Sequence, residues 1–281
     1  MKKRITTSAG TRRYTALEWA VSIGIGLSFA ASTGVVCADE RFFTYSQEAE
    51  VLPQGHWEFE QWLTHRYGRS GGLFSAWDFR EEIEYGLLDN LKAAGYLNFR
   101  QTTDKRPGGA SEFEFEGVSA ELKYRILNPD IQPAGLAFYF EPTYNGAEVE
   151  LEEKLILQKN FGEKWRAVLN ATLEQEWERG SIQTGEELKV EFTAGVTYRM
   201  SPRWSVGLEG RNLRAFVDGI GFDHREHDAW FVGPNVHYGS KNGWATLTVL
   251  PQVHGTPNTS GGLQLEDHEK IEIRLIAGIN F

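Results

Sequence analysis

Apolar and polar residues alternate along most of this chain with a period of two. The clearest run places apolar residues at Leu188, Val190, Phe192, Ala194, Val196, Tyr198 and Met200, with charged or small residues between them. Successive side chains of a β-strand point to opposite faces, so a strand gathers this row on one face, whereas a helix would scatter it. The run from Trp165 to Trp177 and the last segment, from Ile271 to Phe281, have the same pattern.

Twelve segments alternate in this way and are predicted to be strands: 55–67, 73–86, 91–103, 112–126, 134–145, 147–158, 165–177, 188–200, 204–216, 229–239, 244–254 and 271–281. Strands of soluble proteins usually have about five or six residues, whereas tilted strands that cross a membrane need about nine to eleven. The lengths therefore predict an all-β fold, a transmembrane antiparallel up-and-down β-barrel of about 12 strands over residues 55–281.

The connections between these segments also alternate in length. Compact turns are predicted around Pro129, Asn160, Pro202 and Asn242, and longer polar connections at 103–111, 178–185, 217–228 and 255–268. Short turns at one end and long loops at the other are typical of outer-membrane barrels. The connection at 145–147 is an exception, because it is short where a long loop is expected.

The first residues have the composition of an export signal. A basic head that includes Lys2, Lys3 and Arg4 precedes an uncharged stretch, and small residues end it at Ala38. This pattern predicts a cleaved signal peptide over 1–38, a periplasmic N-terminal segment over 39–54 and localisation in the bacterial outer membrane. An uncleaved membrane helix, a lipoprotein signal at Cys37 and a twin-arginine signal at Arg12–Arg13 are weaker alternatives.

Alternation alone does not say which face of a strand points inward. A soluble lipocalin-like barrel would have its apolar face inside, and this alternative stays open. Three features favour lipid contact instead: a twelve-stranded lumen is wide for apolar side chains to fill, the chain ends on an alternating strand, and aromatic residues lie near strand ends, as in interfacial girdles. These aromatic residues are Trp57, Trp165, Trp177, Tyr198, Trp204, Trp230 and Trp244.

The two ends of the predicted barrel carry a resemblance to known proteins. The tail from Ile273 to Phe281, with Ile279 and the aromatic last residue in step, resembles the C-terminal assembly signal of bacterial outer-membrane proteins. The resemblance implies recognition by the barrel-assembly machinery. The opening at 49–60, with Pro53-Gln54-Gly55 before a strand, resembles uncharacterised Gram-negative barrels grouped with transporters of the phenol-degradation (MetA-like) type.

If the apolar face meets lipid, charged residues line the lumen. The lumen-lining candidates are Glu58, Glu60, Asp78, Arg80, Glu82, Lys123, Arg125, Glu174, Glu176, Glu187, Lys189, Glu191, Arg199, Glu209 and Arg211. Acids modestly outnumber bases, which predicts a passive, porin-like channel that transports small solutes and weakly prefers cations. The alternative is that opposite charges pair across the lumen and plug it.

Composition and motifs exclude several other functions. The net charge of −10 argues against a nucleic-acid partner, and no Ser–His pairing, phosphate-binding loop or nucleotide fingerprint is present. We therefore predict no enzymatic activity, catalytic residue, cofactor or metal, with lipid and small solutes as partners. His224 and His227, in a predicted outer loop, are weak metal-ligand candidates. A non-conducting structural or adhesion barrel is the second function considered, and an outer-membrane enzyme the third.

Overall fold

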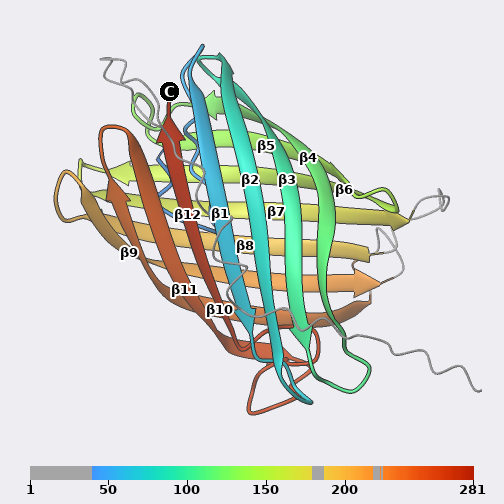
Figure 1. The fold of residues 1–281 in the computed structure, drawn as a ribbon. Coiled ribbons are helices and arrows are strands. Elements are labelled where there is room, and N and C mark those ends of the chain that lie inside the picture. The colour runs from blue at the N-terminus through green and yellow to red at the C-terminus, as the bar shows by residue number, and fades with distance from the viewer. Residues whose placement is uncertain (1–39, 179–186, 218–221, 223) are drawn as a thin grey trace, which may run out of the picture. The chain divides into compact units, whose positions relative to one another are not determined.

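The computed structural model describes residues 40–281 except 179–186, 218–221 and 223. Twelve antiparallel strands form a closed barrel in which each strand pairs with its sequence neighbours and β1 pairs with β12 (Figure 1). The predicted signal peptide, 1–38, lies outside the described residues. Among the described residues, no helix is long and apolar enough to cross a membrane.

The strands confirm the predicted all-β barrel. Their bounds are β1 Trp57–Tyr67, β2 Phe74–Leu88, β3 Leu91–Asp104, β4 Ser111–Leu127, β5 Gly135–Tyr144, β6 Glu148–Phe161, β7 Trp165–Glu178, β8 Glu187–Arg199, β9 Trp204–Val217, β10 Arg225–Gly239, β11 Gly243–Thr256 and β12 Ile271–Asn280. β10 differs most from its predicted range, because it begins four residues earlier and its first residues pair with the end of β9 beside a bulge.

The barrel has two ends that differ in their connections. At the turn end, where β1 starts and β12 finishes, short turns such as 162–164, 200–203 and 240–242 join the strands. At the loop end the described connections include 68–73, 105–110 and the long 257–270. The predicted long segments at 178–185 and 217–228 lie partly outside the described residues.

The outer face of the barrel is apolar. Phe192, Val196 and Met200 expose 40%, 39% and 62% of their surface, as the outward row of β8 requires. Leu188 is buried, although it belongs to the same row. A soluble barrel with an apolar interior would have this row at its centre, so the arrangement argues against the lipocalin-like alternative.

Aromatic pairs surround the turn end on the outside. Trp57 packs against Tyr85, Trp165 against Tyr198 and Trp204 against Tyr238, with tilted rings whose centroids are 4.4, 4.9 and 4.8 Å apart. Such a girdle is expected where a barrel meets a membrane–water interface. Trp244 does not belong to it, contrary to the prediction. Its side chain is buried and its Nε1 donates a hydrogen bond to Glu58 inside the barrel.

A charge on this outer face tests whether it meets lipid. We expect Leu169→Arg, on the exposed apolar row of β7, to lower the free energy of unfolding in lipid vesicles by about 2–4 kcal/mol, because arginine is poorly solvated in hydrocarbon. Denaturant titration in lipid vesicles measures this change. The control is Ile131→Arg in the exposed 128–134 turn, and a cost at Leu169 below about 0.5 kcal/mol, as on a water-facing surface, would contradict the assignment.

Candidate functional site: the barrel lumen and its N-terminal segment

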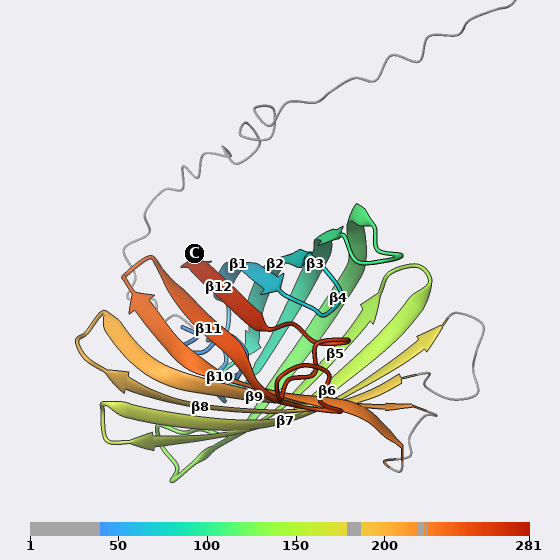
Figure 2. The same ribbon diagram turned by 90° about the horizontal axis from the view of Figure 1, so that it is seen from below.

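The described stretch before β1, from Glu40 to Leu52, lies inside the barrel. The stretch Glu40–Leu52, here called the N-terminal segment, is buried along almost its whole length (blue in Figure 2). The sequence predicts a periplasmic segment over 39–54, and no pattern within it indicates a position inside the lumen. Because this stretch is short and carries several polar residues, its place inside depends on specific partners on the strands.

Glu209 of β9 is the central partner of the N-terminal segment. Its carboxylate accepts backbone N–H bonds from Thr44 (3.2 Å), Tyr45 (2.8 Å) and Ser46 (2.5 Å). The Thr248 hydroxyl donates a further bond to it at 2.9 Å. Three successive N–H groups directed at one anion satisfy backbone donors that would otherwise be buried without acceptors.

Side chains of other strands bind the remaining backbone of the segment. Asn170 of β7 accepts a bond from Gln47 N–H (2.6 Å) and donates one to the Gln47 carbonyl (3.0 Å). Gln158 of β6 accepts from Ala49 N–H at 2.8 Å, and Asn235 of β10 donates to the Phe42 carbonyl at 2.7 Å. These amide side chains form hydrogen bonds with backbone atoms of the segment, so they fix its path across the lumen.

Between these polar contacts, apolar residues of the segment pack against the barrel wall in three small clusters. Tyr45 packs with Ala229, Phe231 and Leu250; Ala49 packs with Ala137, Tyr139 and Ile156; Phe42 and Phe43 pack with Val168. Gly195 of β8 leaves room for Phe43, since a Cβ at this position would overlap the Phe43 ring. The inner face is thus apolar where the N-terminal segment contacts it.

A network of ion pairs crosses the lumen toward the loop end. Glu272, which is 0% exposed, accepts bonds from Arg66 and Arg211, each at 2.8 Å. Arg66 also binds Asp78 at 2.6 Å, and Arg211 binds Glu191 at 2.7 Å. This part of the lumen matches the predicted alternative in which opposite charges pair across the lumen.

Elsewhere on the inner face, carboxylates outnumber bases. On β6, β7 and β8, strand pairing places Glu150 opposite Glu176 and Glu176 opposite Glu187, and Lys189 is the base nearest to them, at 3.3 Å from Glu176 and 3.7 Å from Glu187. Like charges directly opposite one another repel. The inner wall of β6–β8 near the loop end therefore brings several carboxylates around one lysine.

The loop between β11 and β12 narrows the loop end. Gln264, His268 and Glu269 of this loop are buried, and Gln252 of β11 donates to the carbonyls of Gln264 (3.0 Å) and Glu269 (3.1 Å). Glu269 also pairs with Arg69 of the 68–73 loop. The long loop therefore folds inward over the lumen.

The predicted histidine pair is not brought together. His224 is exposed, whereas His227 lies in β10 and contacts His268, with 2.8 Å between His227 Nδ1 and His268 Nε2. His227 was expected in a loop, and the early start of β10 corrects this. Burial, and then the neighbouring His227, lower the pKa of His268 to about 3, so this imidazole is neutral at physiological pH.

The lowered pKa of His268 predicts that acid loosens the 257–270 loop. An exposed histidine binds a proton near pH 6.5 and the buried His268 only near pH 3, so the stability of the packed loop is full above pH 6.5 and is lost as the pH falls through this window. A spin label at exposed Ser260 should become more mobile between these values. The change should be absent in His268→Asn, and equal pH dependence in both proteins would contradict the prediction.

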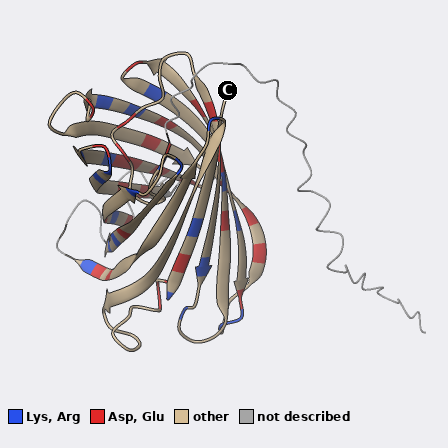
Figure 3. Ribbon diagram, turned by 90° about the vertical axis from the view of Figure 1, so that its left-hand side faces the viewer, with Lys and Arg blue, Asp and Glu red and all other residues tan. Residues whose placement is uncertain are grey.

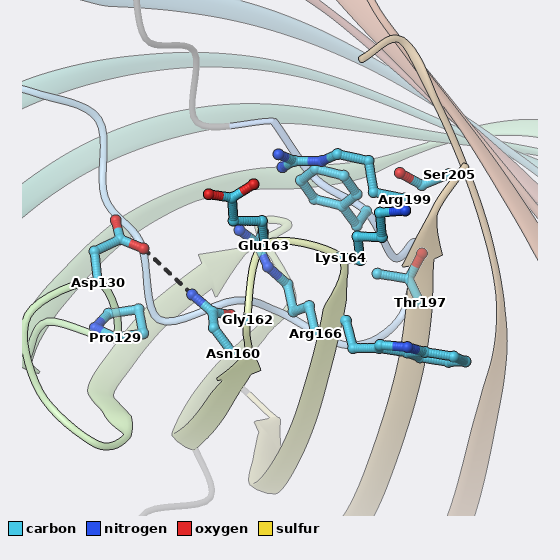
Figure 4. Close-up of a pocket in the computed structure, with 12 residues that line it drawn as sticks. Pro129, Asp130, Asn160, Gly162, Glu163, Lys164, Arg166, Thr197, Arg199 and Ser205 are labelled. Carbon is cyan, nitrogen blue, oxygen red and sulfur yellow. Dashed lines mark hydrogen bonds between the residues drawn. The ribbon is translucent and has the colours of Figure 1, made fainter. Parts of the chain in front are cut away.

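A cavity of about 290 Å³ opens beside the N-terminal segment at the turn end (Figure 4). Lys164, Arg166 and Arg199 line it from the 162–164 turn, β7 and β8, and Asn160 donates to Asp130 across it at 3.2 Å. The guanidinium of Arg166 lies 4.4 Å from the Phe42 ring centroid. Two acids, Asp130 and Glu163, also line this cavity, and Arg166 pairs with Glu50 at 2.9 Å.

The structure places every predicted lumen-lining residue on the inner face, opposite the exposed apolar rows. Charged positions recur along the strands (Figure 3). These inward residues are Glu58, Glu60, Asp78, Arg80, Glu82, Lys123, Arg125, Glu174, Glu176, Glu187, Lys189, Glu191, Arg199, Glu209 and Arg211. The amides Asn170, Gln158 and Asn235 were missed, because nothing in the sequence marks a polar residue that binds backbone.

The predicted assembly residues lie on the closing strand. Ile279 pairs with Phe59 of β1, and Phe281 exchanges two backbone hydrogen bonds with Trp57, of 3.1 and 3.2 Å. Both side chains are exposed on the outer face. The end of β12 therefore completes the ring of strands.

These features define the class of protein: a closed twelve-stranded barrel with the fold of outer-membrane channels. The structure is similar to the COG4313 outer membrane channel from Pseudomonas putida F1, with a TM-score of 0.58 and 14% identity over 85% of this chain and 100% of that chain. It is also similar to the NanC porin, with a TM-score of 0.52 and 10% identity over 79% of this chain and 98% of that one.

The family follows from the sequence. The model of the family of unknown function DUF6662 matches residues 35–281, so the chain belongs to this family. No curated protein matches the sequence. The resemblance to MetA-like transporters is not confirmed by these matches.

Proposed function

We propose that the protein is a passive channel of the bacterial outer membrane, for small solutes, with a weak preference for cations. The observation that carries the proposal is the inner wall of β6–β8, where Glu174, Glu176 and Glu187 share Lys189 as a common base and Glu150 lies opposite Glu176. Rings or walls of one charge bias which ions enter a pore. The channel fold of the two similar structures supports this proposal.

Export and assembly complete the proposal. Residues 1–38 act as a cleaved signal, and the C-terminal strand, through Ile279 and Phe281, is recognised by the barrel-assembly machinery. Lipid contacts the exposed apolar rows, and the turn end faces the periplasm, as short turns do in outer-membrane barrels. No enzymatic role is proposed.

Ion selectivity in planar bilayers tests the channel. Under a salt gradient we expect the sign of the reversal potential to show that cations pass more readily than anions. We expect the double variant Glu174→Gln/Glu176→Gln to move this potential toward zero. The control is Glu153→Gln, because Glu153 is exposed on the outer face of β6. A double variant with the reversal potential of the wild type would contradict the assignment of selectivity to this wall.

One observation favours a second candidate, a non-conducting structural or adhesion barrel. The N-terminal segment and the 257–270 loop occupy the lumen from its two ends. Absence of ion current from folded protein, both wild type and with the segment released, would favour this second function over the channel.

A further inference from the structure

A second group of carboxylates lies on the inner wall between β1 and β2. Strand pairing places Glu60 directly opposite Glu82, and Glu58 opposite Glu84. Glu60, Glu82 and Glu84 each offer one oxygen, and these three oxygens lie within 4.8 Å of one another. All three side chains are buried, so water screens their mutual repulsion poorly.

Two cations of the described residues lie against this group. Lys92 pairs with Glu84, and Arg41 Nη1 lies 3.8 Å from Glu60, whose Oε2 also accepts a 2.8 Å bond from Trp62 Nε1. Glu82 differs from its neighbours. It is 1% exposed, and neither of its oxygens accepts a hydrogen bond from the part of the chain that the structure describes.

A buried carboxylate without a donor is unfavourable unless a cation or a proton reaches it. The charge around the three glutamates also favours binding of a cation. Among the buried residues there, acids exceed bases by two. The acids are Glu58, Glu60, Glu82, Glu84 and Glu121, and the bases are Arg41, Lys92 and Lys123.

We propose that Glu60, Glu82 and Glu84 form a binding site for a divalent cation of the calcium class. Calcium takes six to eight oxygen ligands at about 2.3–2.6 Å, so two oxygens on one ion lie at most about 5 Å apart, and the three oxygens here lie within 4.8 Å of one another. Glu60, Glu82 and Glu84 supply one oxygen each. Zinc fits poorly, because it prefers nitrogen and sulfur ligands.

Terbium, an oxygen-seeking substitute for calcium, tests the site in the full-length barrel in detergent. Trp62 is hydrogen bonded to Glu60, so excitation of tryptophan should produce emission from bound Tb³⁺, and added Ca²⁺ should remove it. We expect Glu82→Gln to weaken Tb³⁺ binding at least about tenfold, a difference of about 1.4 kcal/mol. The matched control is Glu81→Gln, on the same strand but the opposite face.

Several outcomes would overturn the proposal. Folded wild type without sensitised emission would do so, as would equal affinity in Glu82→Gln and Glu81→Gln. Loss of binding in Glu176→Gln, with Glu82→Gln unaffected, would place the ion at the Glu150–Glu174–Glu176 group instead. Should Glu82→Gln fail to fold, Glu60→Gln removes a charge from the same site, and the same tenfold loss is expected.

Discussion

Glu209→Ala should release the N-terminal segment from the lumen and raise single-channel conductance severalfold. The substitution removes the acceptor of the backbone N–H groups of Thr44, Tyr45 and Ser46. Hydrogen bonds to a charged group contribute about 1.5–3 kcal/mol each. A loss of about 3 kcal/mol shifts the balance between docked and released segment more than a hundredfold. Planar-bilayer recordings measure the result.

Two further variants sharpen this experiment. Gly195→Leu should raise conductance by a different route, because its side chain would occupy the space of the Phe43 ring. Ala194→Leu is its control, since Ala194 is exposed on the outer face. Folded Glu209→Ala and Gly195→Leu with the conductance of the wild type would show that the ion path does not pass the N-terminal segment.

Glu272→Ala should lower the free energy of unfolding by about 3–5 kcal/mol, because Arg66 and Arg211 each lose a buried carboxylate partner. Glu272 is fully buried between Arg66 and Arg211. Arg66 keeps Asp78, and Arg211 keeps Glu191, so the barrel is expected to fold, with a lower denaturation midpoint in urea.

The control for this substitution is Glu266→Ala, in the exposed part of the 257–270 loop. A double variant, Glu272→Leu/Arg211→Met, should recover part of the lost stability, because apolar side chains often replace a buried ion pair without net cost. If Glu272→Ala and Glu266→Ala unfold at the same urea concentration, the network contributes little to stability.

Strand positions were predictable because the membrane and the lumen impose opposite demands on neighbouring residues. The row from Val190 to Met200 showed this directly, and most strand ends fell within three residues of their predicted positions. Periodicity was weaker at β10, where Arg225–Asp228 are polar on both faces, and pairing with β9 decided the boundary instead. The local pattern thus fixed the barrel wherever one face was apolar.

The contents of the lumen could not be predicted in the same way. The N-terminal segment has no alternation, and its partners Glu209, Asn170 and Gln158 are far from it in sequence. The inward direction of the Trp244 side chain could not be predicted either, since an aromatic residue near a strand end suits an interfacial girdle equally well. Such contacts depend on which strands face one another across the barrel, and periodicity contains no information about that.

The path of the N-terminal segment has a consequence for the order of assembly. Its first described residue, Glu40, contacts His237 at the turn end of β10, and Pro53 leaves it beside Gly86 at the turn end of β2. Both ends of the described segment therefore lie at the same opening, so Glu40–Leu52 does not need to be threaded from one mouth to the other. The segment can therefore dock as a bent arm after the ring of strands has closed.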